Sequence, residues 1–219
     1  MGRRGDQNTS SRLSDAEYFA ALEECAAKGN VTASWVLGAA YADGFLRRDD
    51  MEDVWLHVRK NLARAEKLLR FVVDSEESGA ILTLAGVYKG KNVRKALRLE
   101  RRAWRMGIAY AANNIAMSYS MLDMPRRCYD WLKRGYAKDR ETHAYPLALC
   151  HLVGYGTPRD VKKARSLFVR VIDRGWDTQD GREKAALFIK MIDRGEAPNP
   201  PRRGRSIGSL RPKARKESD

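Results

Sequence analysis

The sequence repeats one helical pattern, and this repeat restricts the possible folds more strongly than any other feature of the chain. In each copy, small and apolar residues stand at helical spacing and are followed by an aromatic side chain. The pattern ends at Tyr41, Tyr88, Tyr119 and His151, and the last three of these are 31 and 32 residues apart. A fixed period of this length indicates stacked helical hairpins. Such arrays present long surfaces and bind other molecules far more often than they catalyse reactions.

A second helical pattern follows each copy of the first. It begins with a small residue directly after a lysine or arginine, and apolar residues then recur on one helical face. These small residues are Ala65, Ala96, Cys128 and Ala164. We expect Gly29, Gly107 and Gly175 to end second helices, because glycine adopts the left-handed backbone found there. The chain is therefore predicted to consist of antiparallel helix pairs.

The two patterns together resemble the Sel1-like repeat (SLR) family, a relative of the tetratricopeptide repeats, over residues 16–175. The resemblance implies an all-α fold, a right-handed superhelical α-solenoid of antiparallel helix pairs, with the tyrosine helices lining the concave side. It also implies a scaffold or adaptor for protein–protein interaction, without intrinsic catalysis and without a cofactor. Within this family a bacterial regulator or inhibitor of a partner protein would also fit.

The remaining segments depart from the repeat. We expect residues 1–14 to be a disordered N-terminal segment, residues 15–195 to form the solenoid, and residues 180–195 to be its capping helix. Tyr41 and Tyr88 are 47 residues apart, so we place an insertion at about residues 45–60 and predict a loop that contacts a partner. Residues 196–219 lack apolar periodicity and are predicted to be a disordered basic tail.

Charge suggests the class of partner. The 219 residues include 42 Lys and Arg against 28 Asp and Glu, a formal net charge of +14. Such a charge favours acidic proteins, nucleic acid or anionic membrane surfaces. The sequence shows neither a signal-peptide core nor an apolar run long enough to cross a bilayer. We therefore predict a cytoplasmic protein, or a nuclear one in a eukaryotic cell, with Cys25, Cys128 and Cys150 buried and reduced.

The concave surface is the first candidate site. By analogy with related helical repeats, the residues two after each repeat alanine face inward. Together with one residue of the adjacent column, the predicted partner-binding groove is Trp35, Asn113, Met117 and Tyr145. Aromatic anchors and an amide suit an extended segment or a helix of a partner protein. Packing of Trp35 and Tyr145 against the next repeat is an equal alternative.

A basic patch is the second candidate site. Arg94, Arg98, Arg101 and Arg105 follow one another at helical spacing and form one stripe. The repeat register places Arg70 and Lys133 in the same column as Arg101. Neighbouring like charges are unfavourable, so the stripe indicates an acidic partner or a solvated face with dispersed counter-charges.

The tail is the third candidate site. Its basic residues form two clusters: Arg202, Arg203 and Arg205, and then Arg211, Lys213, Arg215 and Lys216. Such tails bind phosphate backbones, serve as nuclear import signals, or simply keep a protein soluble. The alternative function is thus a nucleic-acid-associated protein that uses the helix at residues 94–105 and this tail.

Catalytic and metal-binding motifs do not stand out. His57, His143 and His151 are isolated in the sequence, and His151 occupies the position of the repeat tyrosine. No glycine-rich phosphate loop, zinc motif or nucleophile elbow is present. We therefore predict a non-catalytic protein that binds another protein, of acidic character, through the groove and the insertion.

Overall fold

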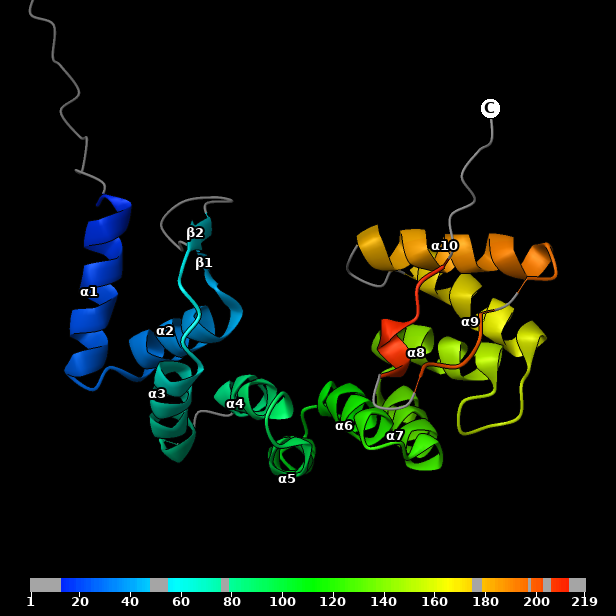
Figure 1. The fold of residues 1–219 in the computed structure, drawn as a ribbon, viewed down its shortest axis with the longest axis horizontal. Coiled ribbons are helices and arrows are strands. Elements are labelled where there is room, and N and C mark those ends of the chain that lie inside the picture. Colours follow the sequence, from blue (N-terminus) through cyan, green and yellow to red (C-terminus); the bar gives the residue numbers. More distant parts are fainter. Residues whose placement is uncertain are drawn as a thin grey trace, which may run out of the picture. The chain divides into compact units, whose positions relative to one another are not determined.

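The computed structural model describes residues 13–47, 55–75, 79–174, 179–196, 198–202 and 206–212. These residues form ten α-helices, one two-stranded sheet and one short 3-10 helix. They belong to two compact units, one within Met1–Val87 and the other within Tyr88–Asp219. Figure 1 labels the elements along the chain. The predicted α-helical repeat architecture is confirmed, with a small β-hairpin added in the first unit.

The first unit is built from neighbouring helices. They are α1 (Asp15–Ala27), α2 (Val31–Asp43), α3 (Leu62–Asp74) and the first part of α4 (Ala80–Lys89). The α2 helix packs against both α1 and α3. The side chains of Ser14, Asn30 and Asn61 cap α1, α2 and α3 by accepting hydrogen bonds from backbone amides. At Gly38 an added Cβ would lie 2.7 Å from Cγ of Leu69, so a small residue permits the close approach of α2 and α3.

The insertion between α2 and α3 contains a β-hairpin. Strand β1 (Phe45–Arg47) pairs antiparallel with β2 (Trp55–His57), with Leu46 opposite Leu56. We predicted a loop here, and the described part differs because both segments alternate in the way a strand requires. Leu46 points inward and is 2% exposed, while its neighbours face out. Residues 48–54 lie outside the described residues.

The second unit is also a stack of helices. Its helices are the end of α4, α5 (Val93–Arg105), α6 (Ala111–Met121), α7 (Pro125–Lys138), α8 (Arg140–Val153), α9 (Val161–Arg174) and α10 (Gln179–Asp193). From α5 onward each helix packs against the next. The largest buried side chains include Ile115, Leu132, Leu149, Phe168 and Phe188. The rings of Phe168 and Phe188 stack at 5.2 Å, which joins α9 to the terminal helix α10.

The two repeat patterns meet in a contact between a tyrosine ring and a cation. In three repeats the basic residue that begins the second helix lies over the ring that ends the first. The pairs are Arg64 with Tyr41 at 4.8 Å, Lys95 with Tyr88 at 3.7 Å, and Arg127 with Tyr119 at 5.6 Å. A cation over an aromatic face is favourable. The contact therefore explains why a lysine or arginine comes directly before the small residue in the second pattern.

The ends of the second helices agree in part with the predictions. Gly29 and Gly107 have φ of 84° and 91°, the left-handed backbone expected of helix-ending glycines. Gly175 lies outside the described residues.

The cysteines differ in burial. Cys128 and Cys150 are buried, but Cys25 is exposed, so its predicted burial is wrong. The helix that carries it, α1, packs on α2 and begins the described array, so part of its surface has no neighbour.

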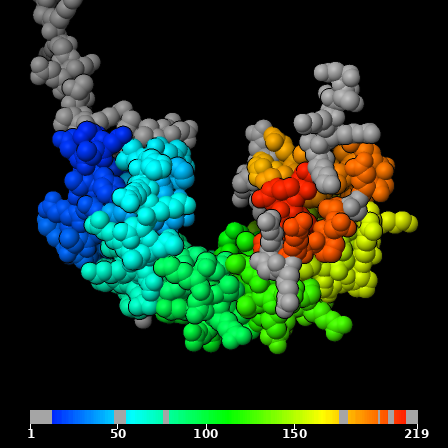
Figure 2. Space-filling model, viewed as in Figure 1, coloured from blue at the N-terminus to red at the C-terminus, as the bar shows by residue number. Residues whose placement is uncertain are grey.

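The C-terminal segment differs from the prediction of a disordered tail. Residues 207–209 form the 3-10 helix η1 (Ile207–Ser209), which contacts α6 and α8. Ile207 is 1% exposed, and Figure 2 shows this segment in red at the surface of the second unit. The apolar side chains of Ile207 and Leu210 pack against the core of the second unit, which stabilises the position of this segment. Residues 1–12, which include most of the predicted disordered N-terminal segment, lie outside the described residues.

None of the helices that the structure describes is both long enough and apolar enough to cross a membrane.

Candidate functional site

The hairpin presents an exposed aromatic surface. Phe45, Arg47, Trp55 and His57 all face away from Leu46, and we call these four residues the hairpin face. The side chains of Phe45 and Trp55 are 54% and 61% exposed. Phe45 and His57 lie opposite each other on the two strands, with their rings 5.9 Å apart in a T-shaped arrangement. The short strands thus hold two large apolar side chains in solvent.

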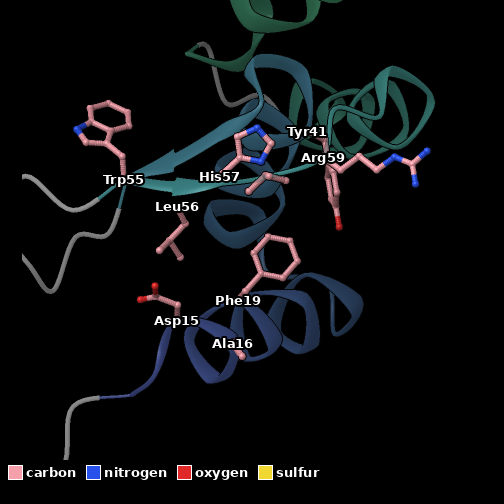
Figure 3. A pocket seen from close by; sticks show the side chains of 9 residues that line it. Asp15, Ala16, Phe19, Tyr41, Trp55, Leu56, His57 and Arg59 are labelled. Atoms are coloured by element: carbon pink, nitrogen blue, oxygen red, sulfur yellow. The ribbon is translucent and has the colours of Figure 1, made fainter.

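A pocket of about 520 Å³ lies between the hairpin and the first helices, and its lining includes Trp55 and His57 of the hairpin face. Figure 3 shows Phe19 rising from α1 and Leu56 descending from β2 toward it, while Trp55 points the opposite way. Tyr41 of α2 and Asp15 at the start of α1 complete much of the lining. The lining combines apolar and aromatic side chains with the charged or polar groups of Asp15, His57 and Arg59, so the pocket suits a side chain with an apolar body.

One wall of this pocket is fixed by a charged network. The Tyr41 hydroxyl donates a hydrogen bond of 2.7 Å to Glu23, and Arg64 forms an ion pair of 2.7 Å with the same carboxylate. Burial, together with the bond to Glu23, raises the pKa of Tyr41 to about 12. The phenol therefore stays neutral at physiological pH and acts as a positioned donor. Phe19 contacts the Tyr41 ring edge to face at 6.1 Å, which orders the apolar part of the wall.

The predicted groove residues lie in both units. Trp35 belongs to the first unit and is half-buried against Gly79, where an added Cβ would lie 2.4 Å from Cη2 of the indole. In the second unit Asn113 is 7% exposed, and its amide nitrogen donates a hydrogen bond of 3.3 Å to the Thr142 carbonyl. This bond links α6 to α8. Trp35 and Asn113 thus both contribute to packing inside their units.

The other two groove residues differ from each other in exposure. Tyr145 is partly buried, with its ring 5.7 Å from Phe168 and 6.3 Å from Phe188. Burial raises the pKa of Tyr145 to about 12. Met117 of α6 is 36% exposed and lies at the surface, outside the core. Among the four, Met117 therefore has the largest exposed fraction.

The predicted basic stripe is present on α5. Arg94, Arg98, Arg101 and Arg105 are all exposed, and Arg102, which we did not include, is exposed as well. Arg101 donates a hydrogen bond to the Tyr119 hydroxyl and is thereby held against α6. The α5 residues Ala96, Leu97, Glu100 and Ala103 are buried. One side of this helix builds the core and the other concentrates positive charge.

The other two residues of the basic patch, Arg70 and Lys133, contact side chains of their own units. Arg70, in the first unit, forms an ion pair of 2.7 Å with Glu66. The ammonium of Lys133, in the second unit, lies 5.4 Å from the Tyr129 ring centroid. Of the basic tail, Arg202 and Arg211 are exposed. The remaining tail residues lie outside the described residues, namely Arg203, Arg205, Lys213, Arg215 and Lys216.

The two buried histidines are structural in their contacts. His143 is 0% exposed, and its Nδ1 lies 2.9 Å from the Asp139 carbonyl. Burial lowers the pKa of His143, against the opposing effect of Asp139. Burial also lowers the pKa of His151, and the nearby Lys163 charge adds to this effect. Within the described residues, no cluster of three or more His, Cys, Asp or Glu side chains is arranged to hold a metal ion.

Comparison with known proteins rests on structure. A Sel1 repeat protein from Oxalobacter formigenes superposes with a TM-score of 0.53 and 20% identity, over 79% of this chain and 74% of that one. The chain has the Sel1-like repeat fold. A protective antigen present in uropathogenic Escherichia coli strains, which displays an SLR fold, superposes with a TM-score of 0.55 and 16% identity. That match covers 84% of this chain and 42% of the antigen.

By sequence, no family profile and no curated protein matches the chain.

The SLR fold was predicted from the repeat patterns, but the hairpin face was not. Its signal is nevertheless present in the sequence. The two tripeptides Phe-Leu-Arg at residue 45 and Trp-Leu-His at residue 55 each place leucine between larger exposed side chains. Alternation over three residues is too short to be distinguished from chance without the pairing.

Proposed function

We propose that this SLR protein is a non-catalytic interaction scaffold, adaptor or regulator. It binds a partner protein through the insertion, or through the first helices of the repeats (α2, α4, α6 and α8), which we call the inner helices, or through both. The observation that carries the proposal is the hairpin face, where Phe45 and Trp55 are more than half exposed. Helical repeat arrays use their extended surfaces for recognition. An insertion that adds exposed aromatic side chains to such an array is the most distinctive surface of the described residues.

Burial of these two aromatic residues by a partner would be favourable. Large aromatic side chains dominate protein interfaces because each buries much apolar area with few rotatable bonds. Arg47 lies opposite Trp55 and His57 opposite Phe45, so polar groups flank both aromatic residues. This arrangement of an apolar centre and a polar rim is typical of transient interfaces. The adjoining pocket beneath Leu56 would accept one further apolar side chain.

A second candidate surface lies on α6, within the second unit. Met117 is exposed on α6, and Asn113 precedes it by one helical turn. The net charge of +14 favours a partner of acidic character. The exposed arginines of α5 would attract such a partner at long range, with an effect on association rate that decreases as salt is added.

The test is affinity purification from a native extract with the wild-type chain, with Trp55→Ala and with Tyr110→Ala. Tyr110 is a matched control, because it is 51% exposed but lies outside the hairpin face. We expect the wild type and Tyr110→Ala to recover the same stoichiometric protein. Trp55→Ala should bind that protein at least about tenfold more weakly, as measured with the purified partner. Equal affinity for both variants would remove the hairpin face from the proposal.

The alternative function is association with nucleic acid. The observation that favours it is the set of arginines on α5, which share one face and are exposed. Phosphate contacts release counterions, so such binding would weaken steeply with salt. A nuclease-treated sample in the same purification separates the two functions. Retention of the partner after nuclease supports the scaffold, whereas complete loss of all recovered material would favour nucleic acid.

A further inference from the structure

The C-terminal segment at residues 206–211, which we call the tail segment, is docked on the first helices of two successive repeats. Ile207 is 1% exposed and joins the core cluster of the second unit, while Leu210 packs against that cluster. The Ile207 amide donates a hydrogen bond of 2.9 Å to Oγ of Ser120 on α6. That hydroxyl donates in turn to the Tyr155 hydroxyl at 2.9 Å. The body of the protein thus offers both an apolar recess and a positioned acceptor.

The tail segment has its own internal hydrogen bonds. The Ser209 amide donates to the Ser206 carbonyl at 2.9 Å, and the Leu210 amide donates to the Ile207 carbonyl at 3.2 Å. Arg211 closes the turn with a 2.8 Å bond from Nη1 to the Gly208 carbonyl. A 3-10 turn places residues three positions apart on the same side. Ile207 and Leu210 can therefore enter the recess together, while Ser209 remains exposed.

The surrounding sequence is unlike that of a core element. Between residue 198 and the C-terminus, Ile207 and Leu210 are the only apolar residues larger than alanine or proline. The other residues are largely Arg, Lys, Pro, Gly and Ser. Chains of this composition cannot build a core alone. Two apolar anchors in such a chain are the usual form of a short peptide ligand, whose side chains fill pockets on a folded domain.

We propose that the recess on α6 and α8 is a peptide-binding site, and that the tail segment is its internal ligand. The site accepts one turn of peptide with apolar side chains three positions apart and an amide directed at Ser120 Oγ. While the tail segment is docked, it covers this part of the inner helices. A partner segment with the same pattern must displace it. The inference rests on the proposed function in that both use the inner helices for binding.

The test uses the full chain and a fluorescent synthetic peptide of residues 201–215 as the probe. Ile207→Asp should release the tethered segment, because a carboxylate cannot enter the apolar recess. Ser209→Asp is the matched control, with the same charge two residues away on an exposed side chain. We expect Ile207→Asp to bind the peptide at least about tenfold more tightly than wild type or Ser209→Asp, because a tethered competitor acts at a high effective concentration.

Circular dichroism and thermal unfolding of the same variants decide whether the segment is a ligand or part of the fold. The proposal requires that Ile207→Asp keep the helical signal and cooperative unfolding of wild type. Loss of either would show that the tail segment is an integral element and would overturn the proposal. So would a folded Ile207→Asp chain that fails to bind the peptide, or a wild type that binds it equally well. None of these results bears on the hairpin face, which the Trp55 variant tests separately.

Discussion

At the scale of single residues, small side chains determine how closely the helices approach. Gly135 lies inside α7, where glycine is normally unfavourable. Its absent side chain makes room for the ring of His143 and for Ala112. The buried His143 in turn occupies space that a helix of larger residues would close. The core thus accommodates the polar ring of His143 because Gly135, which packs against it, has no side chain.

Substitution of Gly135 by alanine is predicted to destabilise the protein. An added Cβ would lie 2.2 Å from Cδ2 of His143 and 2.8 Å from the Ala112 Cβ, so the core must shift. We expect a loss of about 1–3 kcal/mol in the free energy of unfolding, measured by urea denaturation. Gly86→Ala is the control, because Gly86 is exposed in α4 and an added Cβ there would meet no neighbouring side chain or other helix within 4 Å. That change should stabilise by about 0.5–1 kcal/mol, and similar effects at both sites would contradict the packing argument.

At the scale of elements, a buried ion pair connects three successive helices. Glu100 of α5 is 0% exposed, and its Oε1 lies 2.8 Å from the ammonium of Lys89 on α4. Its other oxygen accepts a hydrogen bond of 2.7 Å from Ser118 on α6. The sequence shows Glu100 as one more charge in a charged helix. Glu100 is buried because the packing of α5 directs this side chain toward both α4 and α6.

Removal of this carboxylate is predicted to be costly. Glu100→Ala would leave the largely buried Lys89 without its opposite charge, and we expect a loss of about 3 kcal/mol in unfolding free energy. Chemical denaturation measures the effect. Glu24→Ala, which breaks the exposed pair with Lys28, should change stability by less than about 0.5 kcal/mol. If both changes had the same small effect, the buried pair would contribute no more than a surface pair.

At the scale of the whole molecule, the described residues divide into two units that carry different features. The first unit holds the hairpin face and its pocket. The second holds the basic stripe, the buried histidines and the docked tail segment. The hairpin face, one part of the surface proposed for partner binding, and the buried histidines therefore belong to different units.

Acid is predicted to weaken the second unit. Burial lowers the pKa of His143 and of His151 in the folded state. In acid, the unfolded chain therefore binds protons that the folded chain does not. The free energy of unfolding is highest above about pH 6.5, the ordinary pKa of histidine, and decreases as pH falls through that value. The slope cannot exceed about 1.4 kcal/mol per pH unit for each histidine. Urea denaturation between pH 7.5 and 5.5 measures this slope.

One variant tests the assignment to the buried histidines. His151→Gln should make the slope smaller, because it removes one titrating group. A slope equal to that of the wild type would mean that His151 does not contribute to the acid response.

The amino-acid sequence by itself determined the repeat architecture. The positions of Tyr119, Ala116 and Gly107 predicted helix ends and close contacts because helical periodicity and glycine geometry act locally. The burial of His151 at a tyrosine position followed from the same register. The exposed stripe on α5 was also predictable, because charged side chains at helical spacing share one face.

Only the tertiary structure decided the remaining features, because each depends on residues that are distant in the chain. The hairpin face exists because residues 45–47 pair with residues 55–57 across the insertion. The docking of Ile207 on Ser120 joins residues 87 positions apart. The burial of Glu100 depends on the two helices on either side of it. Local pattern specifies which elements form, whereas the contacts between elements decide which side chains remain available for binding.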